Sequence, residues 1–269
     1  MAEGNRLTVA VEAPQHTGLT RPLDYTSEQT LAPGTLVRVP LGRREVPGLV
    51  WAAGPAETGP AESVPVLRPV TQAILSLPPL NPRWCALVEF AAGYYQRSIG
   101  EVALSVLPPE LRKLNDAQLA SRIKRLGKSL LVAPAPTPET PAATSQTPTL
   151  PLPPLSEEQA QVLRQLDPLV QDGQPATVLL HGTTGSGKTE VYLRAAARAL
   201  EAGRQALVLV PEINLTPQLE ARFAERFAGR HIVSLHSALT PAQRLRHWLA
   251  AHLGLADLVL GTRDRKSVV

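Results

Sequence analysis

A proline-rich stretch near the middle of the chain sets the strongest limit on how these 269 residues fold. The stretch 132–154, VAPAPTPETPAATSQTPTLPLPP, contains eight prolines. Proline lacks a backbone N–H and fixes φ, so neither a helix interior nor a central strand passes through this segment. We expect an extended, semi-rigid linker, with a ligand for a proline-binding module as the less favoured alternative. The chain therefore divides into an N-terminal and a C-terminal part.

Composition narrows the class of protein. Lys and Arg number 27 against 23 Asp and Glu, and 43% of the residues are apolar, which favours a folded and mildly basic protein. The single cysteine, Cys85, forms no internal disulfide and no cysteine-rich zinc site by itself. No run approaches the roughly 18 apolar residues of a membrane span, and the polar start, Met1–Asn5, is unlike a signal peptide. We expect a soluble, cytoplasmic protein with no membrane partner.

The N-terminal part is predicted to be rich in β-structure. Apolar and polar residues alternate in 6–13 and 35–42, and 46–54 is a third strand candidate. Apolar residues at helical spacing then predict a helix over 82–96. A small barrel or sheet with a helix fits this order. No nucleophile–base pair and no metal-binding set is apparent there.

A basic cluster lies just before the linker. Residues 113–130 carry five basic side chains against one acidic one, Asp116, and LNDAQLASRIKRLGK has the period of a short helix with Asp116 as a candidate N-cap. A basic helical face suits contact with phosphate groups. An ordinary solvated face explains the same pattern equally well.

The C-terminal part alternates apolar strands with helices. The expected strands are 176–182, 206–210, 231–236 and 257–261, and the expected helices are 188–202, 216–227 and 240–252. Continuous apolar strands between helices are typical of a parallel sheet that is covered on both faces. The order predicts half or more of a nucleotide-binding α/β domain.

One motif in this part carries chemistry. Residues 182–189, GTTGSGKT, satisfy the pattern G-x-x-x-x-G-K-[ST] between an expected strand, Val178–Leu180, and an expected helix. Such a loop holds phosphates with its backbone N–H groups and the positive end of the helix. We expect Lys188 to reach the β- and γ-phosphates of a nucleotide and the Thr189 hydroxyl to bind its Mg²⁺. The expected loop contacts are Gly182, Thr183, Thr184, Gly185, Ser186, Gly187, Lys188 and Thr189.

Four strings in this part match one family. GTTGSGKTEVYLRA (182–195) and LVLVPEINLTPQ (207–218) are followed by LHS (235–237) and GTR (261–263). Together they resemble the PriA-type primosomal helicases, which belong to helicase superfamily 2, move 3′→5′ along DNA and restart stalled replication forks. The resemblance implies ATP and Mg²⁺ as cofactors. It also implies DNA with forks, single strands and 3′ ends as a partner, together with other primosome proteins and single-strand-binding protein.

The resemblance assigns further residues in the C-terminal part. Gln159 matches the glutamine that reads adenine, although Ser156 stands where the family usually has asparagine, and Glu190 joins the ATP-contacting positions. The positions matched to DNA contact are Pro211, Glu212, Thr216, Pro217, Gln218, His236, Ser237, Thr262 and Arg263. From the residues alone, these are strand ends and helix caps.

The resemblance extends to the N-terminal part. PLDYTS (22–27) and PGTLVRVPLGRR (33–44) resemble the domain of this family that binds the terminal nucleotide of a 3′ end. The matched pocket residues are Asp24, Tyr25, Gly42 and Arg68. A carboxylate accepts hydrogen bonds from a 3′-hydroxyl or a base edge, and tyrosine offers a stacking face. Without the resemblance, Tyr25 is a core residue and Asp24 a turn residue.

Three departures from the family bear on activity. Only the basic helix and the linker stand in the place of the family's winged-helix domain. No Asp-Glu-x-His box follows GTR, no second motor lobe supplies an arginine finger, and 264–269 do not resemble the family. The zinc-binding cysteines of the complete family protein are absent, so zinc is expected only there. We expect a C-terminally truncated fragment with an unrelated tail, able to bind ATP and DNA weakly and to hydrolyse ATP barely.

The expected organisation is therefore α/β with two domains. We expect residues 7–110 to form a β-rich domain that binds 3′ DNA ends. Residues 111–155 are expected to form a basic helix and a linker in place of the winged helix. Residues 156–269 are expected to form an incomplete first RecA-like lobe with a parallel sheet. A non-enzymatic module that binds 3′ ends, with an inactive P-loop half, is the alternative. A small-molecule kinase is a third reading, but it predicts a lid and a second acidic motif, and neither is visible.

Overall fold

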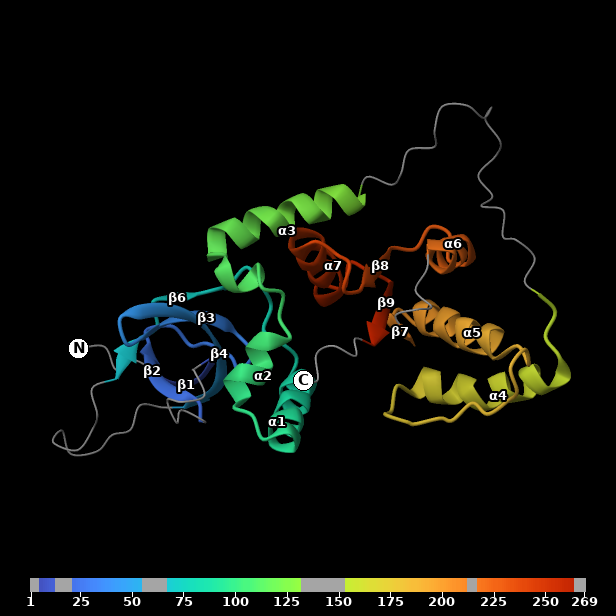
Figure 1. Cartoon of the computed structure of the whole chain (residues 1–269), viewed down its shortest axis with the longest axis horizontal. Helices are drawn as coiled ribbons and strands as arrows, with labels where there is room; N and C mark the ends of the chain where they lie inside the picture. The colour runs from blue at the N-terminus through green and yellow to red at the C-terminus, as the bar shows by residue number, and fades with distance from the viewer. Residues whose placement is uncertain (1–4, 13–20, 55–66, 132–152, 212–216, 264–269) are drawn as a thin grey trace, which may run out of the picture. The chain divides into compact units, whose positions relative to one another are not determined.

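The structure is a computed structural model of the whole chain, and it describes residues 5–12, 21–54, 67–131, 153–211 and 217–263. The chain forms two compact units, residues 1–128 with 241–245, and residues 129–240 with 246–269 (Figure 1). The first unit is built on a β-rich sheet and the second on a parallel sheet with helices. The predicted fold class is confirmed.

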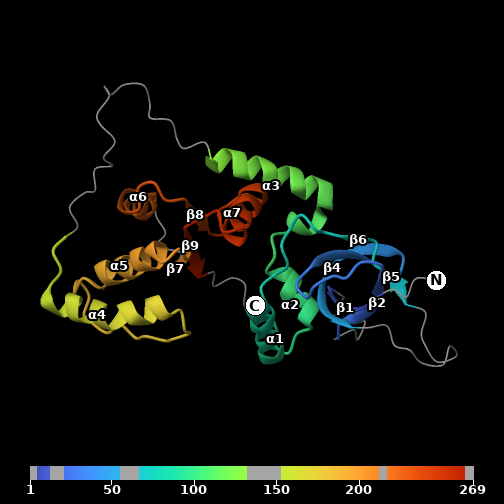
Figure 2. The ribbon, with the colours of Figure 1, turned by 180° about the vertical axis from the view of Figure 1, so that it is seen from behind.

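A curled six-stranded sheet is the frame of the first unit (Figures 1 and 2). Its spatial order is β5-β2-β1-β4-β3-β6, and every neighbouring pair is antiparallel except β2 with β5. The strands are β1 (Asn5–Val11), β2 (Leu23–Ser27), β3 (Leu36–Leu41), β4 (Arg44–Gly54), β5 (Arg68–Pro69) and β6 (Gln72–Ala73).

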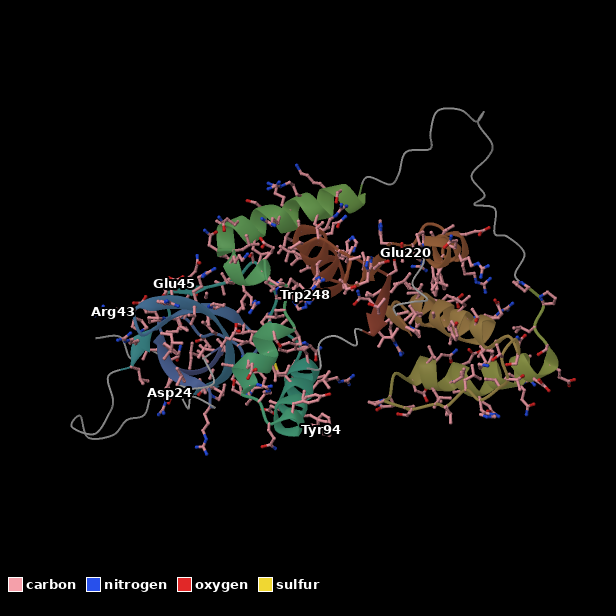
Figure 3. All side chains as sticks on the ribbon, in the orientation of Figure 1. Asp24, Arg43, Glu45, Tyr94, Glu220 and Trp248 are labelled. Atoms are coloured by element: carbon pink, nitrogen blue, oxygen red, sulfur yellow. The ribbon has the colours of Figure 1, made fainter. Side chains whose placement is uncertain are left out.

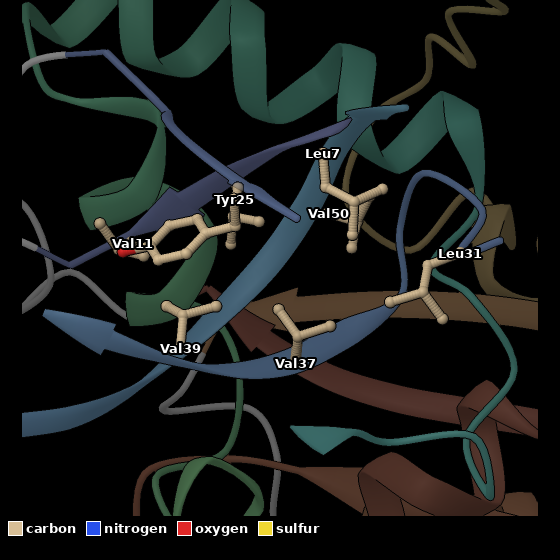
Figure 4. Packing of buried hydrophobic residues seen from close by; sticks show 8 residues of the cluster. Leu7, Val11, Tyr25, Leu31, Val37, Val39 and Val50 are labelled. Atoms are coloured by element: carbon tan, nitrogen blue, oxygen red, sulfur yellow. The ribbon is translucent and has the colours of Figure 1, made fainter. Parts of the chain in front are cut away.

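The core of this unit lies on the inner face of the curled sheet (Figure 4). Alternate residues of β1 point to that face, where Leu7, Val9 and Val11 are at most 5% exposed. They pack with Tyr25, Leu31, Val37, Val39 and Val50. Strand alternation and β-branched side chains therefore fix which face of the sheet is buried.

A tight turn closes the hairpin of β3 and β4. Leu41 pairs with Arg44, so only Gly42 and Arg43 connect the two strands. Gly42 has a φ of +61°, as the first position of a type II′ hairpin turn requires. This turn places the Gly42 carbonyl at the end of the hairpin, where β5 reaches it.

Three helices complete the first unit, α1 (Pro82–Tyr95), α2 (Ile99–Ser105) and α3 (Asp116–Leu131), with a short 3₁₀ turn at Leu111–Lys113. The Trp51 indole donates a 2.8 Å hydrogen bond to Glu89, which ties α1 to β4. Asn115, not Asp116, caps α3: the Asn115 side chain accepts from Gln118 N, and the Gln118 side chain accepts from Asn115 N. Asp116 is the first helical residue, so the predicted N-cap is displaced by one position.

The second unit contains a three-stranded parallel sheet in the order β7-β9-β8. Its elements are α4 (Glu157–Asp172), α5 (Lys188–Glu201), β7 (Ala206–Pro211), α6 (Pro217–Arg226), β8 (Ile232–Leu235) and β9 (Leu258–Arg263), together with α7 (Pro241–His252) from residue 246 onward. Leu258 and Leu260 of β9 pack with Phe223 and Phe227, at the end of α6, and with α5. The predicted β-α alternation from residue 188 onward is confirmed within a few residues at each end.

One predicted strand does not form. Residues 173–183 have no regular secondary structure, and Val178 and Leu179 are 50% and 88% exposed. A buried parallel strand needs hydrogen-bonding neighbours. Within the described residues, β7 and β8 pair only with β9, and no strand pairs with 176–182. The prediction of a strand at Val178–Leu180 was therefore wrong for this structure.

Among the helices that the structure describes, none is both long and apolar enough to cross a bilayer.

Candidate functional site

The glycine-rich loop 182–189 leads directly into α5. Gly185 and Gly187 have φ values of +84° and +76°, a left-handed conformation that favours glycine. Lys188 is the first residue of α5, and its Nζ donates hydrogen bonds of 2.7 and 2.6 Å to the carbonyls of Gly182 and Thr183. The first N–H groups of a helix have no intrahelical acceptor and carry the positive end of its dipole. The loop therefore offers N–H groups and an ammonium to one anion.

Gln159 reaches this loop from α4. Ser156 and Gln159 form a capping box at the start of α4, in which the Gln159 side-chain oxygen accepts from Ser156 N. The Gln159 amide nitrogen donates a 3.2 Å hydrogen bond to the Gly187 carbonyl, and a Cβ at position 187 would overlap it. The structure thus brings the expected adenine-reading glutamine against the phosphate loop.

Thr189 and Glu190 occupy the first turn of α5. Thr189 is exposed, and its hydroxyl accepts a 3.1 Å hydrogen bond from Tyr192. The Glu190 carboxylate pairs at 2.7 Å with both Arg194 and Arg226, and its side chain is only 16% exposed. Glu190 therefore links the helix after the loop to α6, in addition to its expected place beside the nucleotide.

The loop residues fit a nucleotide with Mg²⁺. Positive-φ glycines, a helix N-terminus, an ammonium inside the loop and an exposed threonine hydroxyl are the donor set that phosphates and Mg²⁺ require. Among the residues that the structure describes, no group of three His, Cys, Asp or Glu side chains could hold a metal ion by itself. Cys85 is partly buried, and burial raises the pKa of its thiol.

The residues matched to DNA contact gather at one edge of the parallel sheet. Val210 pairs with Thr262 and Leu235 with Gly261, so Thr262 and His236 lie at the carboxyl ends of neighbouring strands. The carboxyl edge of a parallel sheet is the usual site of ligand contact. The residues at or next to this edge are Pro211, His236, Ser237, Thr262 and Arg263. Pro217 and Gln218 begin α6, while Glu212 and Thr216 lie outside the described residues.

Asp24, which is labelled in Figure 3, lies on β2 and accepts hydrogen bonds from two residues of β1. Arg6 donates a 2.8 Å hydrogen bond to one carboxylate oxygen, and the Thr8 hydroxyl donates at 3.2 Å to the other. The Arg6 guanidinium holds the pKa of this carboxyl below its ordinary value, against a smaller opposing effect of burial. The Asp24 side chain remains 34% exposed, so an ionised acceptor faces solvent.

Strand pairing and one hydrogen bond connect Tyr25, Arg68 and Gly42. Tyr25 pairs with Arg68 across β2 and β5, and Arg68 donates a 2.8 Å hydrogen bond to the Gly42 carbonyl. Tyr25 is only 3% exposed, and its hydroxyl donates to the Pro40 carbonyl. Burial raises the pKa of its phenol. The expected stacking face of Tyr25 is therefore buried in the core, while Arg68 is exposed.

The sequence did not predict that Arg6 and Thr8 contact Asp24. Both alternate with the buried residues of β1, so the period-2 pattern places them on the opposite face of that strand. Their contact with Asp24 depends on the β1–β2 register, which pairs Thr8 with Asp24. That register was not readable from the sequence.

The β-rich unit has a partly exposed carboxylate–arginine pair, and the α/β unit has a glycine-rich loop that leads into a helix. Two family models give the class of protein, a DNA-binding domain joined to a helicase domain. Residues 8–108 match the 3'DNA-binding domain (3'BD), and residues 156–267 match the DEAD/DEAH box helicases.

The curated relatives are more specific. The replication restart protein PriA of Rickettsia prowazekii is 31% identical over 247 residues, which is 90% of this chain and 33% of that protein. PriA of Bacillus subtilis is 41% identical over 111 residues, which is 41% of this chain and 14% of that protein. PriA of Haemophilus influenzae is 54% identical over 86 residues, covering 32% of this chain and 12% of that protein. The chain thus spans a third or less of the length of these relatives. It belongs to the PriA-type family of replication restart proteins.

Proposed function

We propose that this chain carries the DNA-end-binding and ATP-binding parts of an ATP-dependent 3′→5′ DNA helicase of the primosome, which recognises stalled forks and restarts replication. The observation that carries the proposal is the phosphate loop at the start of α5, with Lys188 Nζ held 2.7 Å from the Gly182 carbonyl. In a chain whose other unit matches a 3'DNA-binding domain, such a loop supports a DNA-dependent motor.

Four residues in or beside the loop have proposed roles. Lys188 binds the β- and γ-phosphates, Thr189 binds Mg²⁺ through its hydroxyl, and Gln159 leaves the Gly187 carbonyl to read the adenine edge. When bound, MgATP supplies the hydrolysis energy for movement along DNA. Glu190 keeps α5 and α6 together through Arg194 and Arg226 while the loop is occupied.

DNA is the proposed partner of both units. The carboxyl edge of the parallel sheet, with His236 and Thr262, contacts the single strand. Asp24 and Arg68 bind the terminal nucleotide of a 3′ end, where the ionised carboxylate accepts a hydrogen bond from the 3′-hydroxyl. Other primosome proteins and single-strand-binding protein are further proposed partners by family resemblance, and the cytoplasm is the proposed compartment.

The polypeptide of these 269 residues is proposed to bind ATP and to hydrolyse it barely. Its sequence contains no Asp-Glu pair to place Mg²⁺ and the attacking water. An arginine finger alone contributes roughly 10³–10⁵ in rate to phosphoryl transfer. Hydrolysis by this polypeptide should therefore stay near background when single-stranded DNA is added. Robust DNA-stimulated hydrolysis would contradict this proposal.

A fluorescent ATP analogue tests the loop directly. In an equilibrium titration with Mg²⁺, we expect Lys188→Ala to weaken binding at least tenfold, because the ammonium that meets two phosphates is lost. Lys113→Ala removes an exposed lysine of the other unit and should leave binding unchanged.

A non-enzymatic 3′-end-binding module is the second candidate. The exposed, unpaired segment before the loop favours it, because a phosphate loop normally follows a strand embedded in a sheet. If Lys188→Ala and the wild type bind the ATP analogue equally weakly, while DNA binding is retained, this second candidate describes the chain better.

A further inference from the structure

Every charged side chain of helix α3 after Asp116 is basic. Lys124, Arg125 and Lys128 are exposed, and Leu119 and Leu126 on the other side are 1% and 5% exposed. At about 100° per residue, the four basic residues from Arg122 to Lys128 span an arc of roughly 160° and a rise of about 9 Å. Residues 117–131 contain no acidic side chain. The face thus concentrates positive charge over less than two helical turns.

Three of these four basic residues, Lys124, Arg125 and Lys128, differ from the basic residues just before α3, which have acidic partners. Lys113 pairs with Glu110 at 2.9 Å, and Arg112 pairs with Glu12 at 2.8 Å. Hydrogen bonding to Lys113 lowers the pKa of Glu110, and Arg122 itself lies close enough to Glu110 to help lower the pKa of that carboxyl. Within the described part of the chain, the side chains of Lys124, Arg125 and Lys128 make no hydrogen bond and no ion pair. Their charges are therefore available to an external anion.

The start of α3 is fixed to the sheet of its unit. The Asp116 carboxylate accepts a 2.7 Å hydrogen bond from Ser76 N. The Arg38 guanidinium donates to the carbonyls of Arg112 and Leu114, just before the helix. A charged face on a rigid element that is held at a fixed place can meet a regular array of phosphates without a large ordering cost.

We propose that this face, Arg122, Lys124, Arg125 and Lys128, binds the phosphate backbone of duplex DNA. Duplex DNA carries one charge per roughly 1.7 Å of axis, so the length of this face meets several phosphates. A binder of single strands also offers aromatic stacking platforms, and 116–131 contains no aromatic residue. Figure 3 shows nitrogen-tipped side chains projecting from the upper side of α3. The two matched family ranges, 8–108 and 156–267, leave α3 unassigned.

This inference rests on the proposed DNA function and adds a second, sequence-independent contact to it. The 3′-end contact and the α3 contact are separable, because one depends on a terminal hydroxyl and the other on charge alone. A blunt duplex with 3′-phosphates on both strands removes the first contact and keeps the second.

The test is the salt dependence of binding to that 3′-blocked duplex, measured by fluorescence anisotropy between 50 and 200 mM salt with the full chain. We expect the combined variant Lys124→Gln, Arg125→Gln and Lys128→Gln to lose at least tenfold in affinity at the lowest salt. The slope of log affinity against log salt should fall by about 2–3, since each lost phosphate contact accounts for about 0.9.

Two matched variants isolate the cause. Lys124→Arg, Arg125→Lys and Lys128→Arg together keep the charge of the face and should keep the slope. Arg83→Gln, Arg164→Gln and Arg222→Gln together remove the same charge from exposed positions outside α3 and should also keep it. If the triple glutamine variant loses helical content, the single variants Lys124→Gln and Lys128→Gln replace it. Each should lower the slope of log affinity against log salt by about 0.9.

An unchanged slope in the glutamine variants overturns the proposal, and so does an equal loss in the control that removes charge elsewhere. An equal loss on a single strand of the same length overturns the assignment to duplex DNA. Failure of the proposed 3′-end function is read separately, as equal binding of 3′-hydroxyl and 3′-phosphate ends by the wild type.

Discussion

At the scale of single residues, the chemistry of this protein depends on which charged groups are already paired. Lys188 and Gln159 both rest on carbonyls of the phosphate loop, so they are held close to where a nucleotide binds. Asp24 is paired with Arg6 yet is a third exposed. The exposed charges of α3 have no such partner in the described chain. Some polar groups are thus held in place by contacts within the protein, whereas the basic side chains of α3 are free to bind an external anion.

The pH dependence of stability should report the Arg6–Asp24 pair. Because the folded pKa of Asp24 lies below its unfolded value, the pair contributes fully above pH ~4 and loses its contribution as pH falls through the folded pKa. The contribution is about 0.5 kcal/mol, since both side chains are partly exposed. Thermal unfolding followed by circular dichroism should show Asp24→Asn less stable than the wild type at pH 7 and equal to it near pH 2.

Glu28→Gln is the matched control for this experiment. Glu28 is exposed one residue beyond β2 and has no ion pair among the described residues. Its replacement should leave the pH profile unchanged. A difference between Asp24→Asn and the wild type that persists undiminished at pH 2 would contradict the assigned role of the pair.

Glu190 is predicted to be a structural residue of the second unit. Its replacement by glutamine leaves Arg194 and Arg226, with side chains 23% and 15% exposed, without their shared carboxylate. We expect Glu190→Gln to lower the free energy of unfolding by about 1–2 kcal/mol, between the values for exposed and buried pairs. Urea unfolding measures this. Glu201→Gln breaks a pair with Arg198 in which both side chains are more than half exposed, and it should cost less than about 0.5 kcal/mol.

At the scale of elements, the sequence predicted most of the fold. The strands β1, β3 and β4, helix α1 and the elements from α5 to β9 follow from hydrophobic period, whereas β2, β5, β6, α2 and α4 were not predicted. The strand before the phosphate loop was not predictable in the same way, because its apolar run forms a strand only where neighbouring strands pair with it. The burial of Tyr25 and the Arg6–Asp24 contact depend on strand register, which the local sequence does not encode.

The capping box of α4 is predicted to stabilise the helix and to hold Gln159 in place at the proposed ATP site. Ser156→Ala removes the acceptor of Gln159 N and should destabilise the helix by about 1 kcal/mol. It also frees the Gln159 side chain from its fixed position beside Gly187, so the affinity for an ATP analogue should fall several-fold. Ser156→Thr keeps a hydroxyl cap and should retain both properties. Unchanged nucleotide affinity in Ser156→Ala would mean that Gln159 takes no part in binding.

At the scale of the whole molecule, the two units combine a DNA-end domain with a helicase-type lobe. The family models match the two units separately, and PriA of Rickettsia prowazekii aligns with 90% of the chain. The proposed division of labour is a nucleotide at the start of α5, single-stranded DNA at the carboxyl edge of the parallel sheet, a 3′ end at Asp24 and Arg68, and duplex DNA on α3. Lys188→Ala, Asp24→Ala and the glutamine variants of α3 each remove one of the nucleotide, 3′-end and duplex contacts.

The most direct test compares two partial-duplex DNAs that differ only at the 3′ end, one with a free hydroxyl and one with a phosphate. In fluorescence anisotropy, we predict clear preference for the hydroxyl, because the phosphate repels the ionised Asp24 and removes the hydrogen-bond donor. Asp24→Ala should abolish the preference. Equal binding of both DNAs, falling only with salt, would contradict 3′-end recognition and leave a generic contact with phosphates.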